Sequence, residues 1–152
     1  MTLSQTPAYV LRQVMIDLGL GTLPSSSGVW PIYTHAEPPK PDSCMTLKDT
    51  TGEKFDRGAV TGKVVEHHGV QIRLRDADPN DGYVKIHDVM DALNEDITYE
   101  PVTVTDPTGT GTSTYTVYAI TCKGTVNPLG KDPNSNRWLW TLNVTISLHL
   151  VT

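Results

Sequence analysis

Cysteine is scarce in this sequence, and that scarcity limits the chemistry open to the chain. The 152 residues contain two cysteines, Cys44 and Cys122, which lie far apart and form no Cys-x-x-Cys motif. Disulfide frameworks and zinc clusters are built from several cysteines at short, regular spacings. The pattern therefore argues against a fold stabilised by disulfide bonds, and it predicts two reduced thiols in a cytosolic protein.

Positive charge is also in short supply, and no long apolar run is present. The chain has 12 Lys and Arg residues against 17 Asp and Glu, a formal net charge of -5. Phosphate binding needs a basic surface, so nucleic acid is not expected as a direct ligand. A membrane span needs about 18 apolar residues in a row, and an export signal needs a cationic start followed by an apolar stretch. Neither occurs, so we expect a soluble, unexported protein with no membrane partner.

Two segments show the periodicity of amphipathic helices. The first has Pro7 in its first turn, Ser4 or Thr6 as the expected cap, and Gly19 at its end. The second runs from Tyr83 to Glu95. In both segments apolar residues recur every three or four positions, which gives each helix one buried face.

Alternating apolar and polar residues predict strands between and after these helices. The clearest case runs from Trp138 to Leu150, where every even position is apolar. Its 13 positions would span roughly 40 Å at about 3.3 Å per residue, so this strand is expected to run past its own core. Further strands are expected at 29–34, 43–48, 63–67, 70–75, 102–105 and 115–122. The first of these contains Pro31, which favours an edge position.

The order of elements is helix, strands, helix, strands, with joins that read more as hairpins than as long crossovers. This order predicts an α+β fold in which a mostly antiparallel, mixed β-sheet carries two helices packed on one face. Three polar segments, 35–42, 49–60 and 123–136, are expected to form long protruding loops. The length suits a single domain covering residues 1–152.

The acidic stretch from Arg75 to Tyr83 (RDADPNDGY) raises the question of a calcium site. An EF-hand loop starting at Asp76 would need Gly at its sixth position and Glu at its twelfth. Those positions hold Asp81 and His87. Asx-turns together with a helix cap at Asn80 or Asp81 explain the stretch as the turn before the second helix.

No pattern of catalytic, cofactor-binding or metal-binding residues is found. His67 and His68 are adjacent, and on a strand they would point to opposite faces, so they cannot share one metal ion. A zinc site or a cysteine nucleophile using His87 and Cys44 would have to be assembled at long range, without a spacing to support it. We therefore predict no catalytic residue, no cofactor and no metal site.

Arg73 and Arg75 are the candidate subunit-interface residues. Both fall on the polar face of the strand expected at 70–75, where they could pair with carboxylates of a neighbouring chain. A solvated charged face without a partner is the alternative, since exposed charges usually contribute little.

Several pieces of the chain occur in a characteristic order. They are an N-terminal helix, YVLRQVMIDLGLG; a WPIY segment; the stretches HHGVQIRLRD and GYVKIHDVMDAL; and the strand pair YTVYAITCKG and NRWLWTLNVTISL. In this order the chain resembles the tail terminator and minor capsid (tail completion) proteins of long-tailed bacteriophages. Gly69 to Asp76 and Gly82 to Asn94 match best.

This resemblance implies a structural subunit without enzymatic activity. Proteins of that family form a ring, commonly a hexamer, at the head-proximal end of the tail tube, where the ring stops tube polymerisation and presents the head-docking surface. The implied partners are further copies of the chain, the tail tube protein and a head-tail connector or stopper, while DNA passes through the ring without specific binding. The implied location is the virion tail at the head-tail junction, after assembly in the host cytoplasm. Another junction protein, such as a stopper, adaptor or minor capsid protein, is the alternative, and a metal-dependent enzyme is a more distant one.

Overall fold

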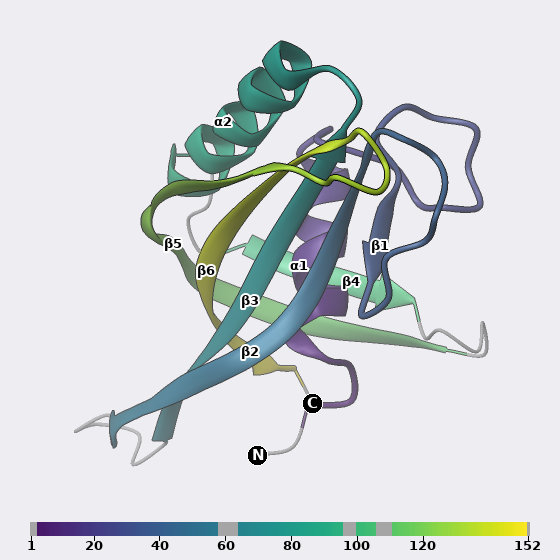
Figure 1. Ribbon diagram of the computed structural model, residues 1–152. Helices are drawn as coiled ribbons and strands as arrows, with labels where there is room; N and C mark the ends of the chain where they lie inside the picture. Colours follow the sequence, from purple (N-terminus) through teal and green to yellow (C-terminus); the bar gives the residue numbers. More distant parts are fainter. Residues whose placement is uncertain (1–2, 58–63, 96–99, 106–110, 152) are drawn as a thin grey trace.

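One curled β-sheet organises the molecule (Figure 1). The computed structural model describes residues 3–57, 64–95, 100–105 and 111–151. Its elements are α1 (Pro7–Asp17), β1 (Ile32–Thr34), β2 (Cys44–Arg57), β3 (Val64–Asp76), α2 (Pro79–Glu95), β4 (Glu100–Thr105), β5 (Thr112–Lys131) and β6 (Trp138–Leu150). The strand order is β1-β2-β3-β6-β5-β4. The short edge strand β1 is parallel to β2, and the other neighbouring pairs are antiparallel. The expected mixed α+β fold is confirmed.

Both helices pack against the same face of the sheet. The register places Leu47, Ile72 and Leu142 side by side across β2, β3 and β6, and all three are fully buried. On that face Asp49 of β2 contacts the start of α1, while Trp140 of β6 lies against α2. The sheet curls so that α1 sits inside its bend, and α2 lies along β5 and β6 (Figure 1). One apolar core results, and each fully buried aliphatic side chain contributes about 1.5–3 kcal/mol to it.

A residue of the sheet caps the N-terminus of α1. Thr6 occupies the capping position with an extended backbone, but its side chain makes no capping bond. The Ala8 amide donates instead to Asp49 Oδ1 at 2.9 Å, and the Thr6 hydroxyl lies 3.3 Å from His35 Nε2. The prediction of Ser4 or Thr6 as the cap residue is confirmed for Thr6, but the side-chain acceptor at this helix end comes from a distant strand.

Replacing Asp49 with alanine is expected to lower the free energy of unfolding by about 1 kcal/mol. The change removes a capping acceptor and a carboxylate that interacts favourably with the helix N-terminus. Asp49→Asn keeps an acceptor, so about half of the loss should be recovered. Urea unfolding of both variants measures this, with Thr51→Ala, an exposed change on the same strand, as the control. A loss for Asp49→Ala no larger than that of Thr51→Ala would contradict the capping role.

The helix α2 begins at Pro79 instead of Tyr83. Asp78 Oδ1 accepts hydrogen bonds from the amides of Asn80 at 2.8 Å and Asp81 at 3.1 Å. Proline suits the first helical position because the N–H that it lacks would have no partner within the helix. The acidic stretch is thus a turn and a helix cap, as predicted, but Asp78 makes the capping bonds.

Two of the three expected loops are largely strand. Residues 49–57 belong to β2 and 123–131 to β5, whereas 35–42 is a connection; residues 58–60 lie outside the described part of the chain. In the first case, Gly52 allows β2 and β3 to approach closely. Any larger residue would place its Cβ 2.3 Å from the His67 carbonyl oxygen. In β5, register shifts and the positive φ angles of Gly124 and Gly130 let the ladder to β6 continue. Hydrogen bonding to a distant strand outweighs the local turn composition.

The part of the sheet that leaves the core is the far end of β2 and β3. Trp138–Leu150 is the extent predicted for β6, but its even-numbered side chains from Trp140 to Leu148 are buried, so the expected overhang of this strand is wrong. Instead, β3 pairs with β6 only from His67 onward. The segments 54–57 and 64–66 pair with each other and project as a two-stranded ribbon (Figure 1). We call these two segments the arm.

Candidate functional site

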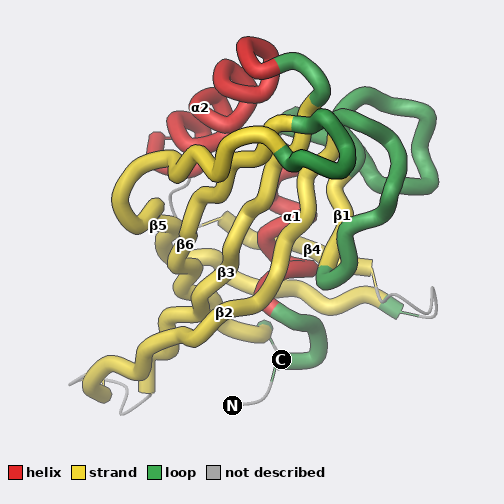
Figure 2. Tube along the Cα trace, viewed as in Figure 1, coloured by secondary structure: helices red, strands yellow, loops and turns green. Residues whose placement is uncertain are grey.

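The connections of the molecule gather at the end of β2 and β3 that is opposite the arm. Figure 2 shows the segments around 18–31 and 35–43, the turn between β5 and β6, and the start of α2 close together at this end. Loops at one end of a rigid sheet are the usual place for binding residues. The polar contacts and hollows of this end therefore define the candidate site.

Arg73 and Arg75 contact the same carboxylate within the chain. Arg73 Nε lies 3.4 Å from Glu37 Oε1, and Arg75 Nη1 lies 3.7 Å from Glu37 Oε2. Arg75 Nη2 also donates to the Pro41 carbonyl at 2.6 Å. The side chain of Arg75 is 6% exposed and that of Arg73 is 30% exposed. The two guanidinium groups thus fasten the segment 35–43 onto the polar face of the sheet, and their contact with a neighbouring subunit stays a prediction.

The turn between β5 and β6 is joined to the same segment. Arg137 Nη2 lies 2.7 Å from Asp42 Oδ1, which links this turn to the connection before β2. Within the turn, Asp132 accepts from the Asn134 amide at 3.0 Å and from the Ser135 hydroxyl at 2.8 Å. These bonds, the amide foremost, lower the pKa of Asp132 from its ordinary value. The loop end is therefore held by several charged contacts.

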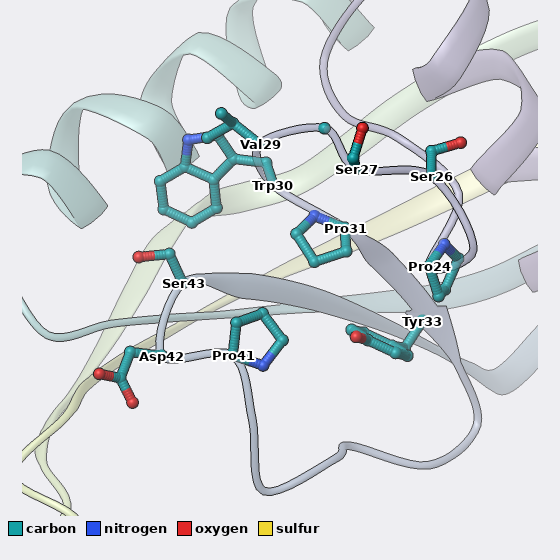
Figure 3. Close-up of a pocket in the computed structure, with 11 residues that line it drawn as sticks. Pro24, Ser26, Ser27, Val29, Trp30, Pro31, Tyr33, Pro41, Asp42 and Ser43 are labelled. Carbon is teal, nitrogen blue, oxygen red and sulfur yellow. The ribbon is translucent and has the colours of Figure 1, made fainter.

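A groove runs between the segment 24–31 and the first turns of α2. It consists of two adjoining hollows of about 460 and 390 Å³, which share Val29, Trp30 and Ser43 in their walls. Val84 of α2 lines the second hollow, and the rings of Pro31, Pro41 and Tyr33 line the first (Figure 3). Val29 is 76% exposed and Val84 is 56% exposed. The groove thus offers apolar surface to a ligand or a partner.

The groove has an acidic rim. Asp42, Asp81 and Asp88 are exposed beside its apolar walls, and the buried Asp76 lies at its floor. The one cation among the residues of the two walls is Lys85, whose Nζ lies 5.7 Å from the centre of the Trp30 ring. Partial burial lowers the pKa of Lys85, and Asp88 opposes that effect. Asp42 is already paired with Arg137, so the exposed carboxylates of Asp81 and Asp88 and the ammonium group of Lys85 set the charge at this rim.

The floor of the groove is fixed by hydrogen bonds. Asp76 Oδ1 accepts from the Ser43 hydroxyl at 2.9 Å and from the Asp78 amide at 3.2 Å. These bonds connect the start of β2, the end of β3 and the turn into α2. The acidic stretch 75–83, which does not match a calcium-binding loop, therefore fixes the relative positions of the groove walls.

The histidines and cysteines are dispersed over the structure. His67 Nδ1 is hydrogen-bonded to the Ser147 hydroxyl, and His87 Nδ1 lies 2.9 Å from the Tyr83 carbonyl oxygen. Both cysteines are free thiols, and burial raises the pKa of Cys44 and raises that of Cys122 to about 11. Neither thiol is thus activated as a nucleophile.

Two kinds of feature are absent from the part of the chain that the structure describes. Within it, no group of three or more His, Cys, Asp or Glu side chains is placed to hold a metal ion. None of its helices has the length and apolar character needed to cross a membrane.

Sequence reasoning missed the residues that build this end of the molecule. Glu37 lies in a proline-rich connection and gives no sign of its ion pairs. Trp30 belongs to the WPIY segment, which does not indicate that it lines a groove. A lone carboxylate between prolines, in a chain with two arginines on one strand face, is a weak signal that could have suggested the ion pairs. No sequence signal indicated that Val84 would face Trp30 across a groove.

The fold has a counterpart among solved structures. The chain is similar to a chain of a structure described as "Virion of native gene transfer agent (GTA) particle", with a TM-score of 0.50 and 15% sequence identity. The match covers 93% of this chain and 92% of that chain. At this identity the likeness concerns the fold. A comparison with curated protein sequences gives no match.

The family is established by a separate match. A model of the family described as bacteriophage tail terminator protein matches residues 14–150. The chain belongs to the bacteriophage tail terminator family. It is a structural component of a phage virion, located in the tail, and the resemblance noted in its sequence is confirmed.

Proposed function

We propose that the protein forms a ring at the head-proximal end of the tail tube, ends tube polymerisation and presents the surface that docks onto the head. The observation that carries this proposal is the family match over residues 14–150. One core shared by both helices and the sheet supports its action as a single domain over residues 1–152. A projecting arm at one end and a groove at the other supply surfaces for contacts with other chains.

We further propose that the two arginines have different roles. Arg73, with 30% of its side chain exposed, is the member of the pair that a neighbouring subunit or the tail tube protein can contact. Arg75 is buried and acts on the interface by holding the segment 35–43 in place. The chain needs no enzymatic activity, cofactor or specific DNA contact for this role, and its net charge of -5 suits a ring through which DNA passes without binding.

The ring is tested with the purified full-length chain. Light scattering and negative-stain images are expected to show a closed ring, of about six copies by the family resemblance, either alone or after tail tubes are added. Added protein should also stop the growth of tail tube protein in a polymerisation assay. A protein that stays monomeric in the presence of tubes and does not limit their length would refute the proposal.

A stopper or adaptor role is the competing proposal within the virion. The two roles differ in the contacted partner, since a terminator binds the tail tube and a stopper binds the connector at the head. Pull-down of the tail tube protein, against the connector protein as the matched alternative, separates them. Binding to the connector alone would favour the stopper.

A further inference from the structure

A row of polar side chains crosses the face of the sheet that is opposite the two helices. The register places Lys48 of β2, Gln71 of β3, Asn143 of β6 and Lys123 of β5 side by side. The residues that flank Gln71 and Asn143 along their strands are buried in the core, so the row points to the other side of the sheet. Gln71 Nε2 donates to Asn143 Oδ1 at 3.3 Å, and Asn143 and Lys123 are exposed. We call these four residues the polar row.

The face that carries the polar row is cationic. Among the residues of β2, β3, β5 and β6 whose side chains the structure describes, the carboxylates are Asp49 and Asp76. Both lie on the helix side, where Asp49 contacts the start of α1 and Asp76 lies beside the start of α2. Glu37 reaches the open face from segment 35–43, but there it contacts two arginines. With Lys48 and Lys123 added, cations outnumber carboxylates on this face.

The outer side of α2 has the opposite charge. Asp81, Asp88 and Asp91 are exposed on this helix. Its one lysine, Lys85, is partly buried, and the Nζ atom lies 5.7 Å from the centre of the Trp30 ring. The chain therefore presents carboxylates on the helix layer and ammonium groups on the open face of the sheet.

The charges on the two surfaces have a similar spacing. Asp81 and Asp88 are seven residues apart, so they lie on the same side of α2 at roughly 10 Å along its axis. Lys48 and Lys123 are separated by three steps between neighbouring strands, which is roughly 14 Å. The flexible lysine side chains can span the difference. Val84, which is 56% exposed, lies between the two carboxylates and would be covered in a contact.

The two surfaces face in opposite directions from one molecule. The helix α2 packs on one face of the sheet and the polar row lies on the other, so they cannot meet within a single chain. Different patches on opposite sides of a subunit make a head-to-tail contact, which closes into a ring when successive rotations return to the start. Copies with a net charge of -5 repel one another, and a contact between opposite charges offsets that repulsion.

We propose that the outer side of α2 in one copy docks on the polar row of the next copy, with Asp81 and Asp88 facing Lys48 and Lys123. The proposal rests on the proposed ring and names the contact between its subunits. Arg73 follows the polar row on the same face of β3, so the contact is continuous with the residue proposed above to meet a neighbouring subunit.

Charge reversal on each side of the contact tests the proposal. Lys48→Glu and Lys123→Glu each place a carboxylate in the polar row, and Asp88→Lys places a cation on α2. Each variant is expected to raise the concentration needed for ring formation by about tenfold or more, since like charges then meet at every interface. The row variants make the net charge more negative and the helix variant makes it less negative, so net charge cannot explain a loss common to both. Asp17→Lys, an exposed change on α1 outside both surfaces, is the matched control for Asp88→Lys and should assemble like the wild type.

Mixing the defective variants gives the decisive measurement. Asp88→Lys is mixed in equal amounts with Lys48→Glu and, separately, with Lys123→Glu. In rings of alternating subunits, an unchanged helix then meets an unchanged row, and a reversed helix meets a reversed row. One of the two mixtures is expected to form rings near the wild-type concentration, and it identifies the lysine that faces Asp88. Light scattering follows assembly, and circular dichroism with urea unfolding shows whether each variant is folded.

Three outcomes would overturn the contact. If the wild type forms rings and all three folded variants form them equally well, the contact is wrong while the ring proposal stands. If the lysine variants keep their rings but bind tail tubes or duplex DNA less than the wild type, the polar row receives that partner instead of α2. If every variant is defective and neither mixture recovers, Asp88 does not face the row. A wild type that forms no ring, even on tubes, refutes the ring itself.

Discussion

Replacing Gly82 with alanine is expected to lower the free energy of unfolding by about 2 kcal/mol, although the same change in an exposed helix would be stabilising by up to ~1 kcal/mol. A Cβ at this position would lie 2.3 Å from Cζ3 and 2.6 Å from Cη2 of Trp140. The Trp140 indole is buried, and its residue is 6% exposed, so it cannot move aside without repacking of the core. Steric overlap therefore outweighs the gain in helix propensity.

A double-mutant cycle separates the two contributions. In a Trp140→Leu background the indole is gone, so adding the methyl group at position 82 should be neutral or stabilising, an interaction energy of about 2 kcal/mol. Trp140→Leu alone will itself be destabilising, so all comparisons use that variant as the reference. Asp91→Ala, an exposed change on α2, is the control and should stay within about 0.5 kcal/mol of the wild type. Equal losses for Gly82→Ala in both backgrounds would exclude the clash as the cause.

Replacing Arg75 with methionine is expected to cost about 2–3 kcal/mol, whereas Arg73→Met should cost about 1 kcal/mol or less. Arg75 is buried and holds both Glu37 and the Pro41 carbonyl, so its loss leaves a buried acceptor and weakens the fastening of segment 35–43. The side chain of Arg73 is 30% exposed, and its Nε lies near Glu37 without forming a hydrogen bond, so less is lost when it is replaced.

Urea unfolding and hydrogen exchange test this asymmetry. Exchange of the amides in segment 35–43 should become faster in Arg75→Met and stay near the wild-type rate in Arg73→Met. Similar losses of stability in the two variants would contradict the idea that Arg75 contributes more than Arg73 to holding this segment. Unchanged exchange in Arg75→Met would show that this segment is held by other contacts, such as the ion pair between Asp42 and Arg137.

Elements whose signal is periodic along the chain could be predicted before the fold was known. The alternation from Trp138 to Leu150 predicted β6 with the ends that the structure has, and the stripe of apolar residues predicted α1 and most of α2. The acidic stretch before α2 was also recognisable as a turn and cap, because Asx-turns and proline act on the nearest backbone groups. In each case the interaction that specifies the structure joins residues close in sequence.

Features that depend on which strands become neighbours could not be predicted in this way. Asp49 caps α1, Glu37 meets Arg73 and Arg75, and β2 continues through Gly52 because strand pairing brings together residues remote along the chain. The groove likewise requires the loop before β1 to meet α2. Side-chain periodicity specifies which face of an element is buried, but the partner of that face follows from sheet order and register, and these are settled only when the whole core packs.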